Sequence, residues 1–201
     1  MNWTFERDRS VLLVIDMQNY FVLEGAPLEV PQARKQVPHI KGLIEKCREL
    51  KVPVIYTAHE PDPVNCPLEA AATPWLREFG ALEGTKEARI IDELSPQAGD
   101  VVVKKRRFSA FFQTDLELIL RHIRGTERPA DTVIICGTMT HVCCESTARD
   151  AFYRDFKVVL GSDVCSSLRP ESHNAAINNM RLFGRAMDRD SIINALEAGR
   201  G

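Results

Sequence analysis

The chain has 201 residues, of which 44% are hydrophobic, and a formal net charge of −2 at pH 7. This length fits one domain, placed at residues 1–201, with a hydrophobic core that needs no disulfide or metal. The near-neutral charge and the isolated basic run 104–107 argue against a nucleic-acid partner. We also expect no membrane partner, because no apolar run approaches the roughly 20 residues of a membrane-spanning helix.

Short apolar runs alternate with helical patterns along the whole chain. The first run, residues 10–16, is almost continuously apolar, which is typical of a strand buried on both faces. Four further strands and a short sixth one are predicted at 52–58, 100–104, 131–136, 157–163 and 185–188. Helices are predicted from Val37 to Leu50 and at about 114–123, 141–155, 170–184 and 190–199.

Three of the predicted helices carry local signals at their ends. Pro38 fits the first turn of its helix, and Thr114 with Glu117 has the spacing of a capping box. The helix at 170–184 begins with proline and has Gly184 as its predicted terminating residue. Residues 59–98 have only a weak helical signal, and such a long segment inside a compact domain is usually functional.

The alternation predicts an α/β fold: a doubly wound, mostly parallel sheet of five to six strands with helices on both faces. Such sheets bind ligands at the carboxyl ends of their strands. An acid, lysines and a thiol are predicted at that rim. The polar residues at the strand ends are Asp16, His59, Lys104, Lys105, Cys143 and Asp163.

Each of these residues also has an ordinary structural explanation. Asp16 can cap a turn, Lys105 can be a solvated charge, and Cys143 can be a small residue buried under a helix. Their convergence on one edge favours a reactive site. A helix N-terminus and a lysine are expected to lower the thiol pKa from about 8.5. The carboxylate can then take the thiol proton, and backbone N–H groups can hold an oxyanion.

Three segments, VLLVIDMQNYF (11–21), VVVKKRRFSAFFQTDLE (101–117) and GTMTHVCCESTARDAF (137–152), resemble the isochorismatase-like cysteine hydrolases over roughly residues 10–195. The resemblance implies a Cys-Asp-Lys triad that cleaves amide or ureido C–N bonds through a thioester. In the family pattern G-x-x-T-x-x-C, Gly137 and Thr140 place the nucleophile at Cys143. Cys144 is interpreted as a packing residue. Asp16 is the implied acid.

The same resemblance implies the remaining parts of the site. Counting back from Ser109 gives Lys105 as the catalytic lysine, with Lys104 as the alternative. A cis peptide is implied at Thr138–Met139, and the N–H groups of Met139 and Cys143 would form the oxyanion hole. Substrate-pocket candidates come from position instead: Tyr20 and Phe108, which replace the family's usual aspartate and tyrosine, Phe21, His59 at the rim, and Trp75 in the long segment, for which ordinary packing is the alternative.

Nicotinamidases of this superfamily bind a metal through a D-x-H motif, but here the segment reads Thr57, Ala58, His59. Together with the absence of a C-x-x-C pair, this predicts no metal or other cofactor. His59 is as well explained by an inert loop position as by a pocket role. Two other functions stay open: vinyl ether hydrolysis of the isochorismatase type, and a non-catalytic thiol protein that senses oxidants or binds a ligand.

Location and assembly complete the expectations. The N-terminal segment lacks a signal-type apolar run, so we expect a cytoplasmic protein whose six cysteines are free thiols. Cys47 and Cys136 are expected to pack as small hydrophobes. The partner is a small-molecule substrate, and the resemblance implies a homo-oligomer.

Overall fold

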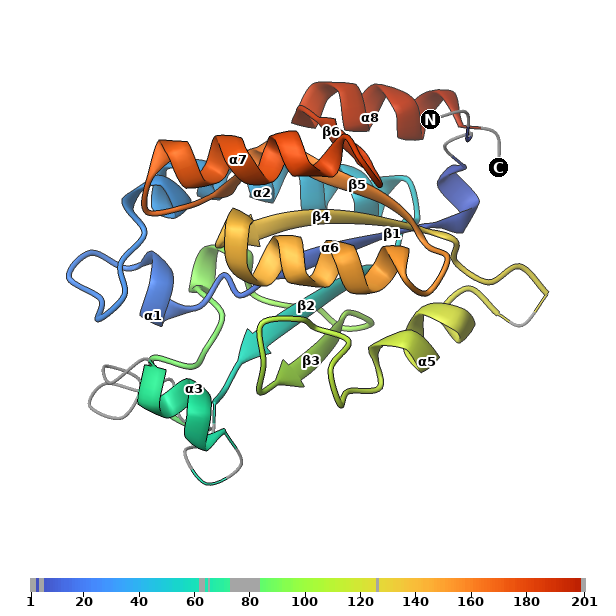
Figure 1. The fold of residues 1–201 in the computed structure, drawn as a ribbon. Helices are drawn as coiled ribbons and strands as arrows, with labels where there is room; N and C mark the ends of the chain where they lie inside the picture. Colours follow the sequence, from blue (N-terminus) through green and yellow to red (C-terminus); the bar gives the residue numbers. More distant parts are fainter. Residues whose placement is uncertain are drawn as a thin grey trace.

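A single sheet of six parallel strands organises the molecule (Figure 1). The computed structural model describes residues 3, 6–61, 64, 66–72, 84–125 and 127–199. The strand order is β3-β2-β1-β4-β5-β6. The strands are β1 (Ser10–Ile15), β2 (Val54–His59), β3 (Val101–Lys105), β4 (Thr132–Thr138), β5 (Lys157–Ser166) and β6 (Arg185–Met187). The predicted α/β class is confirmed, and every described pairing in the sheet is parallel.

Helices cover both faces of this sheet, as predicted. One face packs against α1 (Asn19–Val22), α2 (Pro31–Glu49) and α8 (Arg189–Ala198), the other against α5 (Leu116–His122), α6 (Glu145–Phe152) and α7 (Pro170–Met180). Figure 1 shows α6 in front of the sheet and α2 behind it. Shorter elements are the 3-10 turns Arg7–Arg9 and Asp92–Leu94, the π-helical turn Thr140–Cys144, and α3 (Pro67–Ala72).

The strands form because their side chains are buried on both sides. All six residues of β1 are buried. Val11 and Leu13 point to the α5–α6 side, whereas Leu12 and Val14 point to the α2 side. The alternation of a strand thus serves two apolar cores. Cys47 and Cys136 belong to the α2-side core, as expected, and all six cysteines are free thiols.

Two predicted helix starts are wrong. α2 begins at Pro31, so Pro38 lies in the helix interior instead of the first turn. The Thr114–Glu117 capping box does not form, because α5 begins at Leu116. The Thr114 hydroxyl instead accepts from the Leu116 N–H and donates to the Ala110 carbonyl. Glu117 pairs with arginines.

The predicted end of α7 is also wrong. The helix ends at Met180, and Gly184 does not terminate it in a left-handed conformation. A Cβ atom on Gly184 would lie 2.4 Å from the Met180 Cε and 2.8 Å from the Val158 carbonyl oxygen. Close packing of the chain against β5 therefore explains this glycine.

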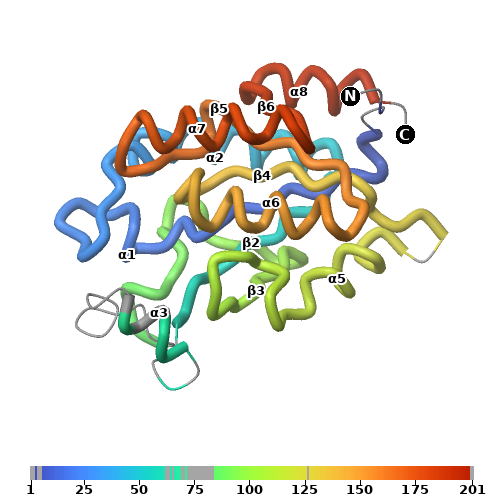
Figure 2. The backbone as a smooth tube through the Cα atoms, in the orientation of Figure 1, coloured from blue at the N-terminus to red at the C-terminus, as the bar shows by residue number. Residues whose placement is uncertain are grey.

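The long segment 59–98 is described in part. Its C-terminal portion packs against the chain after β1, where the Ile91 N–H donates to Met17 and the Asn19 N–H donates to Arg89. No helix among the described residues has the length and apolar character to span a membrane. The first and last described elements, the turn Arg7–Arg9 and α8, lie side by side in Figure 2, where Arg7 adjoins Gly199.

Candidate active site

Asp16 lies directly after β1, buried at the carboxyl edge of the sheet. Its backbone has φ +50°, a left-handed conformation that is uncommon outside glycine and tolerated by aspartate. The neighbouring strand β2 holds it through Thr57. The Thr57 hydroxyl donates to Asp16 Oδ1 at 2.5 Å and accepts from the Asp16 N–H at 3.1 Å. The carboxylate is thereby fixed in direction as well as in position.

Lys105, the last residue of β3, is buried and pairs with this carboxylate. Its Nζ lies 2.8 Å from Asp16 Oδ2 and also donates to the carbonyls of Arg107 and Phe108, at 3.0 and 3.1 Å. Burial alone would lower the pKa of this ammonium, but the Asp16 carboxylate and then Cys143 raise it above its ordinary value. Lys105 therefore stays cationic.

Lys104 occupies the opposite side of the strand. Its side chain is 55% exposed and its Nζ lies 3.5 Å from Glu60. Because neighbouring strand residues point in opposite directions, only one of the two lysines can face Asp16. The alternative of Lys104 beside the acid is wrong in geometry.

Gly137 brings the next strand close to Asp16. It has φ +117°, and a Cβ atom there would lie 2.1 Å from the Ile15 carbonyl oxygen. The β4–β5 register also shifts between Ile135 and Gly137. Only glycine permits this approach of β4 to the end of β1. One residue further along, the peptide bond Thr138–Met139 is cis, the geometry that the family resemblance implied.

Cys143 lies in the π-helical turn Thr140–Cys144 that precedes α6. Its Sγ, a carboxylate oxygen of Asp16 and a ring nitrogen of His59 all lie within 4.8 Å of one another. The predicted helix over 141–155 thus begins with a π turn, a local widening that is frequent at functional sites. Cys144 points into the apolar core and is fully buried, in agreement with a packing role.

The expected lowering of the Cys143 pKa is wrong. Burial raises the pKa of this thiol well above its usual range. Lys105 opposes that effect, and the Asp16 carboxylate adds to it. Loss of water around the sulfur disfavours the charged thiolate. The Lys105 ammonium favours the thiolate less strongly, because it is already paired with Asp16. The resting thiol is therefore protonated at neutral pH, and its reaction requires a base.

His59 and Gln18 form a further part of the site. His59 is the last residue of β2 and is buried, so its predicted loop position is wrong, while its role in the pocket stays a prediction. Its N–H donates to Gln18 Oε1 at 2.8 Å, and Gln18 Nε2 donates to the carbonyls of His59 and Ala88. Sequence reasoning assigned no role to Gln18 or to Thr57. The only available signal was position, since Gln18 stands two residues after Asp16 and Thr57 two residues before His59.

The other pocket candidates differ in position. Phe108 is 41% exposed, and its ring centroid lies 6.2 Å from that of His59, so it adjoins the reactive groups. Tyr20 and Phe21 pack edge to face within the α2-side core. Burial raises the pKa of Tyr20 to about 12. Their contact with substrate stays a prediction, as does the oxyanion hole of Met139 and Cys143. Trp75 lies outside the described residues.

Asp16, His59 and Cys143 also have the spacing of metal ligands. The Lys105 ammonium lies 2.8 Å from that same carboxylate. A cation would have to share the carboxylate with this ammonium at close range, which costs electrostatic energy in a buried site. The donor set therefore fits proton transfer better than a metal ion.

Comparison with known proteins agrees with this geometry. The family model Isochorismatase domain matches residues 10–191. Nicotinamidase 3 of Arabidopsis thaliana is 32% identical over 191 residues, covering 93% of this chain and 88% of the relative. Ureidoacrylate amidohydrolase RutB of Yersinia enterocolitica is 30% identical over 214 residues, covering 96% and 91%. Enterobactin synthase component B of Escherichia coli is 31% identical over 173 residues; the match covers 86% of this chain and 58% of that relative.

Solved structures share the whole fold. A cysteine hydrolase from Pseudomonas syringae pv. phaseolicola superposes with a TM-score of 0.90 at 28% identity, covering 99% of this chain and 97% of that one. The match of the family model and the identity to full-length relatives confirm the resemblance that the three motifs indicated. The chain belongs to the isochorismatase domain family.

Proposed function

We propose that this protein is a cysteine hydrolase that cleaves a C–N bond of a small amide, carbamoyl or ureido compound through a thioester. The observation that carries the proposal is the buried group of Asp16, Lys105 and Cys143, gathered from three separate strand ends. A thiol, a carboxylate and an ammonium in contact are the groups that nucleophilic catalysis at a carbonyl requires.

The first half of the reaction forms the thioester. Asp16 takes the proton of the Cys143 thiol, and Lys105 stabilises the anionic charge that passes between them. The sulfur attacks the carbonyl carbon, and the N–H groups of Met139 and Cys143 hold the resulting oxyanion. The C–N bond then breaks, and the amine or ammonia leaves with the proton that Asp16 had taken.

The second half releases the enzyme. Water loses a proton to Asp16 and attacks the thioester carbonyl. The C–S bond breaks, the acid leaves, and the proton returns to sulfur. One carboxylate serves both halves because it lies beside the sulfur throughout. The raised pKa of Cys143 supports this role, since a thiol that is protonated at rest needs an adjacent base.

Cleavage of C–N bonds is favoured over vinyl ether hydrolysis and over a sensing role. Nicotinamidase 3 and ureidoacrylate amidohydrolase are both named for action on nitrogen compounds and align with nearly the whole chain. Protonation of a vinyl ether needs an acid but no sulfur nucleophile. A sensor needs an activated thiol, whereas burial raises the pKa of Cys143.

The proposal extends to location and assembly. Six free cysteines suit a reducing compartment, which supports a cytoplasmic protein. The partner is a small substrate, with no role for nucleic acid or membrane. Exposed apolar side chains at Phe152, Tyr153 and Leu182 support association into a homo-oligomer. Light scattering of the purified protein measures the assembly directly, and a monomer at micromolar concentration contradicts it.

The experiment is a panel of small primary amides, N-carbamoyl acids and ureido acids with ammonia or amine release as the readout. Wild type and Cys144→Ala are expected to turn over the same compounds, and Cys143→Ala none. Intact mass after a rapid quench is expected to show an acyl adduct on Cys143. Turnover by Cys143→Ala, or an adduct on Cys144, contradicts the mechanism.

A further inference from the structure

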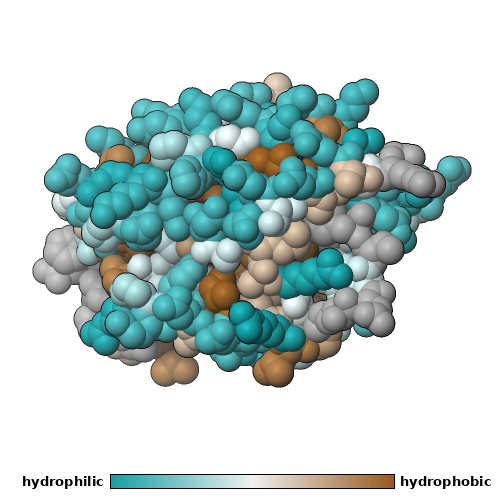
Figure 3. All heavy atoms as spheres, turned by 90° about the horizontal axis from the view of Figure 1, so that it is seen from above, coloured by the Kyte–Doolittle hydropathy of each residue, from teal (hydrophilic) through white to brown (hydrophobic). Residues whose placement is uncertain are grey.

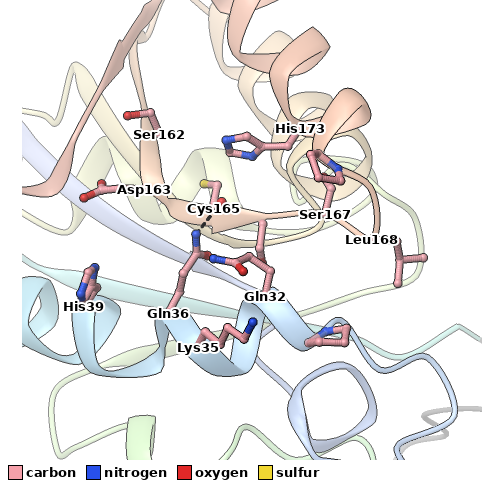
Figure 4. A pocket seen from close by; sticks show the side chains of 13 residues that line it. Gln32, Lys35, Gln36, His39, Ser162, Asp163, Cys165, Ser167, Leu168 and His173 are labelled. Atoms are coloured by element: carbon pink, nitrogen blue, oxygen red, sulfur yellow. Dashed lines mark hydrogen bonds between the residues drawn. The ribbon is translucent and has the colours of Figure 1, made fainter.

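A groove of about 590 Å³ lies beside the reaction centre and includes none of Asp16, Lys105 and Cys143. It runs between the N-terminal turns of α2 and α7 and has the end of β5 as its floor (Figure 4). Figure 4 shows Asp163 and His39 at one end and Leu168 at the other, with Gln36 and His173 facing the space between the helices.

Two helix N-termini and one lysine lie at this groove, with the Asp163 carboxylate at one end of it. Pro31 and Pro170, the first residues of α2 and α7, both line it, and neither helix has a side-chain cap at its N-terminus. The two helix dipoles therefore present their positive ends, with uncapped N–H groups, to one space. Lys35, exposed on the next turn of α2, adds an ammonium group. Such a setting favours an anionic group.

Two buried polar atoms in the groove wall lack a hydrogen-bond partner among the described residues. They are Gln36 Oε1 and Ser166 Oγ, on side chains that are 8% and 2% exposed. Gln36 Nε2 donates to the Cys165 carbonyl at 3.1 Å, so its oxygen is left as an acceptor. Buried polar groups almost always have a partner. This acceptor requires an N–H or O–H donor, and the Asp163 carboxylate offers a second acceptor nearby.

We propose that this groove binds a small amino or amido acid, with its carboxylate at the two helix N-termini and Lys35 and its N–H group at Gln36. The ligand must carry both groups, because a bare anion leaves Gln36 Oε1 unpaired and a bare amine meets the positive helix ends. No bond is made or broken in this step, which is binding alone.

Three hydrogen-bond contacts connect the groove to the chain segment that precedes the nucleophile. Ser166 accepts at its carbonyl from the Thr138 hydroxyl at 3.4 Å. His173 Nδ1 lies 2.9 Å from Thr140 Oγ1, and Ser167 Oγ lies 2.9 Å from His141 Nδ1. All three join the groove to residues 138–141, which lead directly to Cys143. A ligand that holds the groove walls therefore also restrains the turn that carries the thiol.

The test is calorimetric titration with glycine, β-alanine and 4-aminobutyrate, which span three separations of the two charged groups. Acetate, propionate and butyrate lack the donor, and methylamine, ethylamine and propylamine lack the carboxylate. At least one amino acid is expected to bind about tenfold or more tightly than its matched acid and amine. Lys35→Ala is expected to weaken binding about two- to fivefold, because Lys35 is exposed, and Lys41→Ala, on the same helix outside this groove, by less than about twofold.

None of these amino acids contains an amide bond to cleave, and Cys143→Ala should bind them equally well. The groove is thus tested independently of catalysis. The rate of Cys143 alkylation by iodoacetamide is expected to change about fivefold at saturation in wild type, and the same change in Lys35→Ala is expected to require correspondingly more ligand. Absence of saturable binding, or wild-type affinity in Lys35→Ala, overturns the site. Binding without any change in alkylation overturns its link to the nucleophile.

Discussion

Replacement of Lys105 by methionine tests the buried ion pair. The change keeps an apolar stem of similar length and removes the ammonium that contacts Asp16 and the carbonyls of Arg107 and Phe108. Both partners of the pair are fully buried. Breaking such a pair from one side costs about 3–5 kcal/mol, because the remaining charge stays desolvated. Against a typical total of about 5–15 kcal/mol, that is a large part of the stability.

A double-mutant cycle measures the pairing itself. Asp16→Asn alone leaves a buried ammonium, whereas Asp16→Asn with Lys105→Met leaves no charge at all. The double variant is therefore expected to recover about 1–3 kcal/mol relative to the sum of the single losses. Lys104→Met is the matched control; its exposed pair with Glu60 is worth less than about 1 kcal/mol.

The assay is urea unfolding followed by circular dichroism at constant protein concentration, with equal m-values required for the comparison. Additive losses in the double variant refute the coupling of Asp16 to Lys105. If Lys104→Met loses as much unfolding free energy as Lys105→Met, the burial argument is refuted, because a solvated charge would then contribute as much as a buried one. Neither outcome depends on knowing the substrate.

Three further predictions concern the surroundings of the pair. Thr57→Val removes both contacts of the hydroxyl with Asp16, so kcat/KM is expected to fall about 10–150-fold. Thr57→Ser keeps the hydroxyl and is expected to stay within about threefold of wild type. Equal activities of the Val and Ser variants contradict this role. Gly137→Ala is expected to lose roughly 2–5 kcal/mol in thermal or urea unfolding, against roughly 1–2 for Gly99→Ala, whose φ is +96° with open space around it. Alkylation of Cys143 by iodoacetamide is expected to accelerate from pH 7 to beyond pH 9, because the thiolate reacts and the raised pKa keeps it scarce; a plateau below pH 8 excludes that shift.

The architecture could be predicted because strands buried on both faces are recognisable in the sequence as short apolar runs. β1 is an almost continuous apolar run, β5 contains a shorter one at its start, and the helices repeat apolar residues every three or four positions. Helix ends were less predictable, since Pro38 is compatible with a first turn and is in fact tolerated inside α2. Neither spacing nor composition distinguishes the two, because the residues upstream of Pro38 are mixed in character.

Site residues were predictable only where the side chain is ionisable or nucleophilic. An acid, a lysine and a thiol at strand ends attract notice, whereas Thr57 and Gln18 look like ordinary polar residues until their contacts are seen. The direction of the Cys143 pKa depends on desolvation. A sequence that places a lysine and a helix near the thiol does not reveal how completely water is excluded there.

The separation of the charged partners within the sheet limits what evolution or design can change. Lys105 ends β3 and Asp16 follows β1, so the whole width of β2 lies between their backbones. At about 4.8 Å per strand the ammonium bridges roughly 10 Å, a span suited to a long unbranched side chain and closed to aspartate, serine or alanine. A one-residue slip of β2 would turn Thr57 away and leave both ionic groups in place without the hydroxyl that steers the acid. The intervening strand therefore acts as a spacer whose alignment tunes reactivity, and substitutions confined to it can alter turnover while the charged groups stay intact.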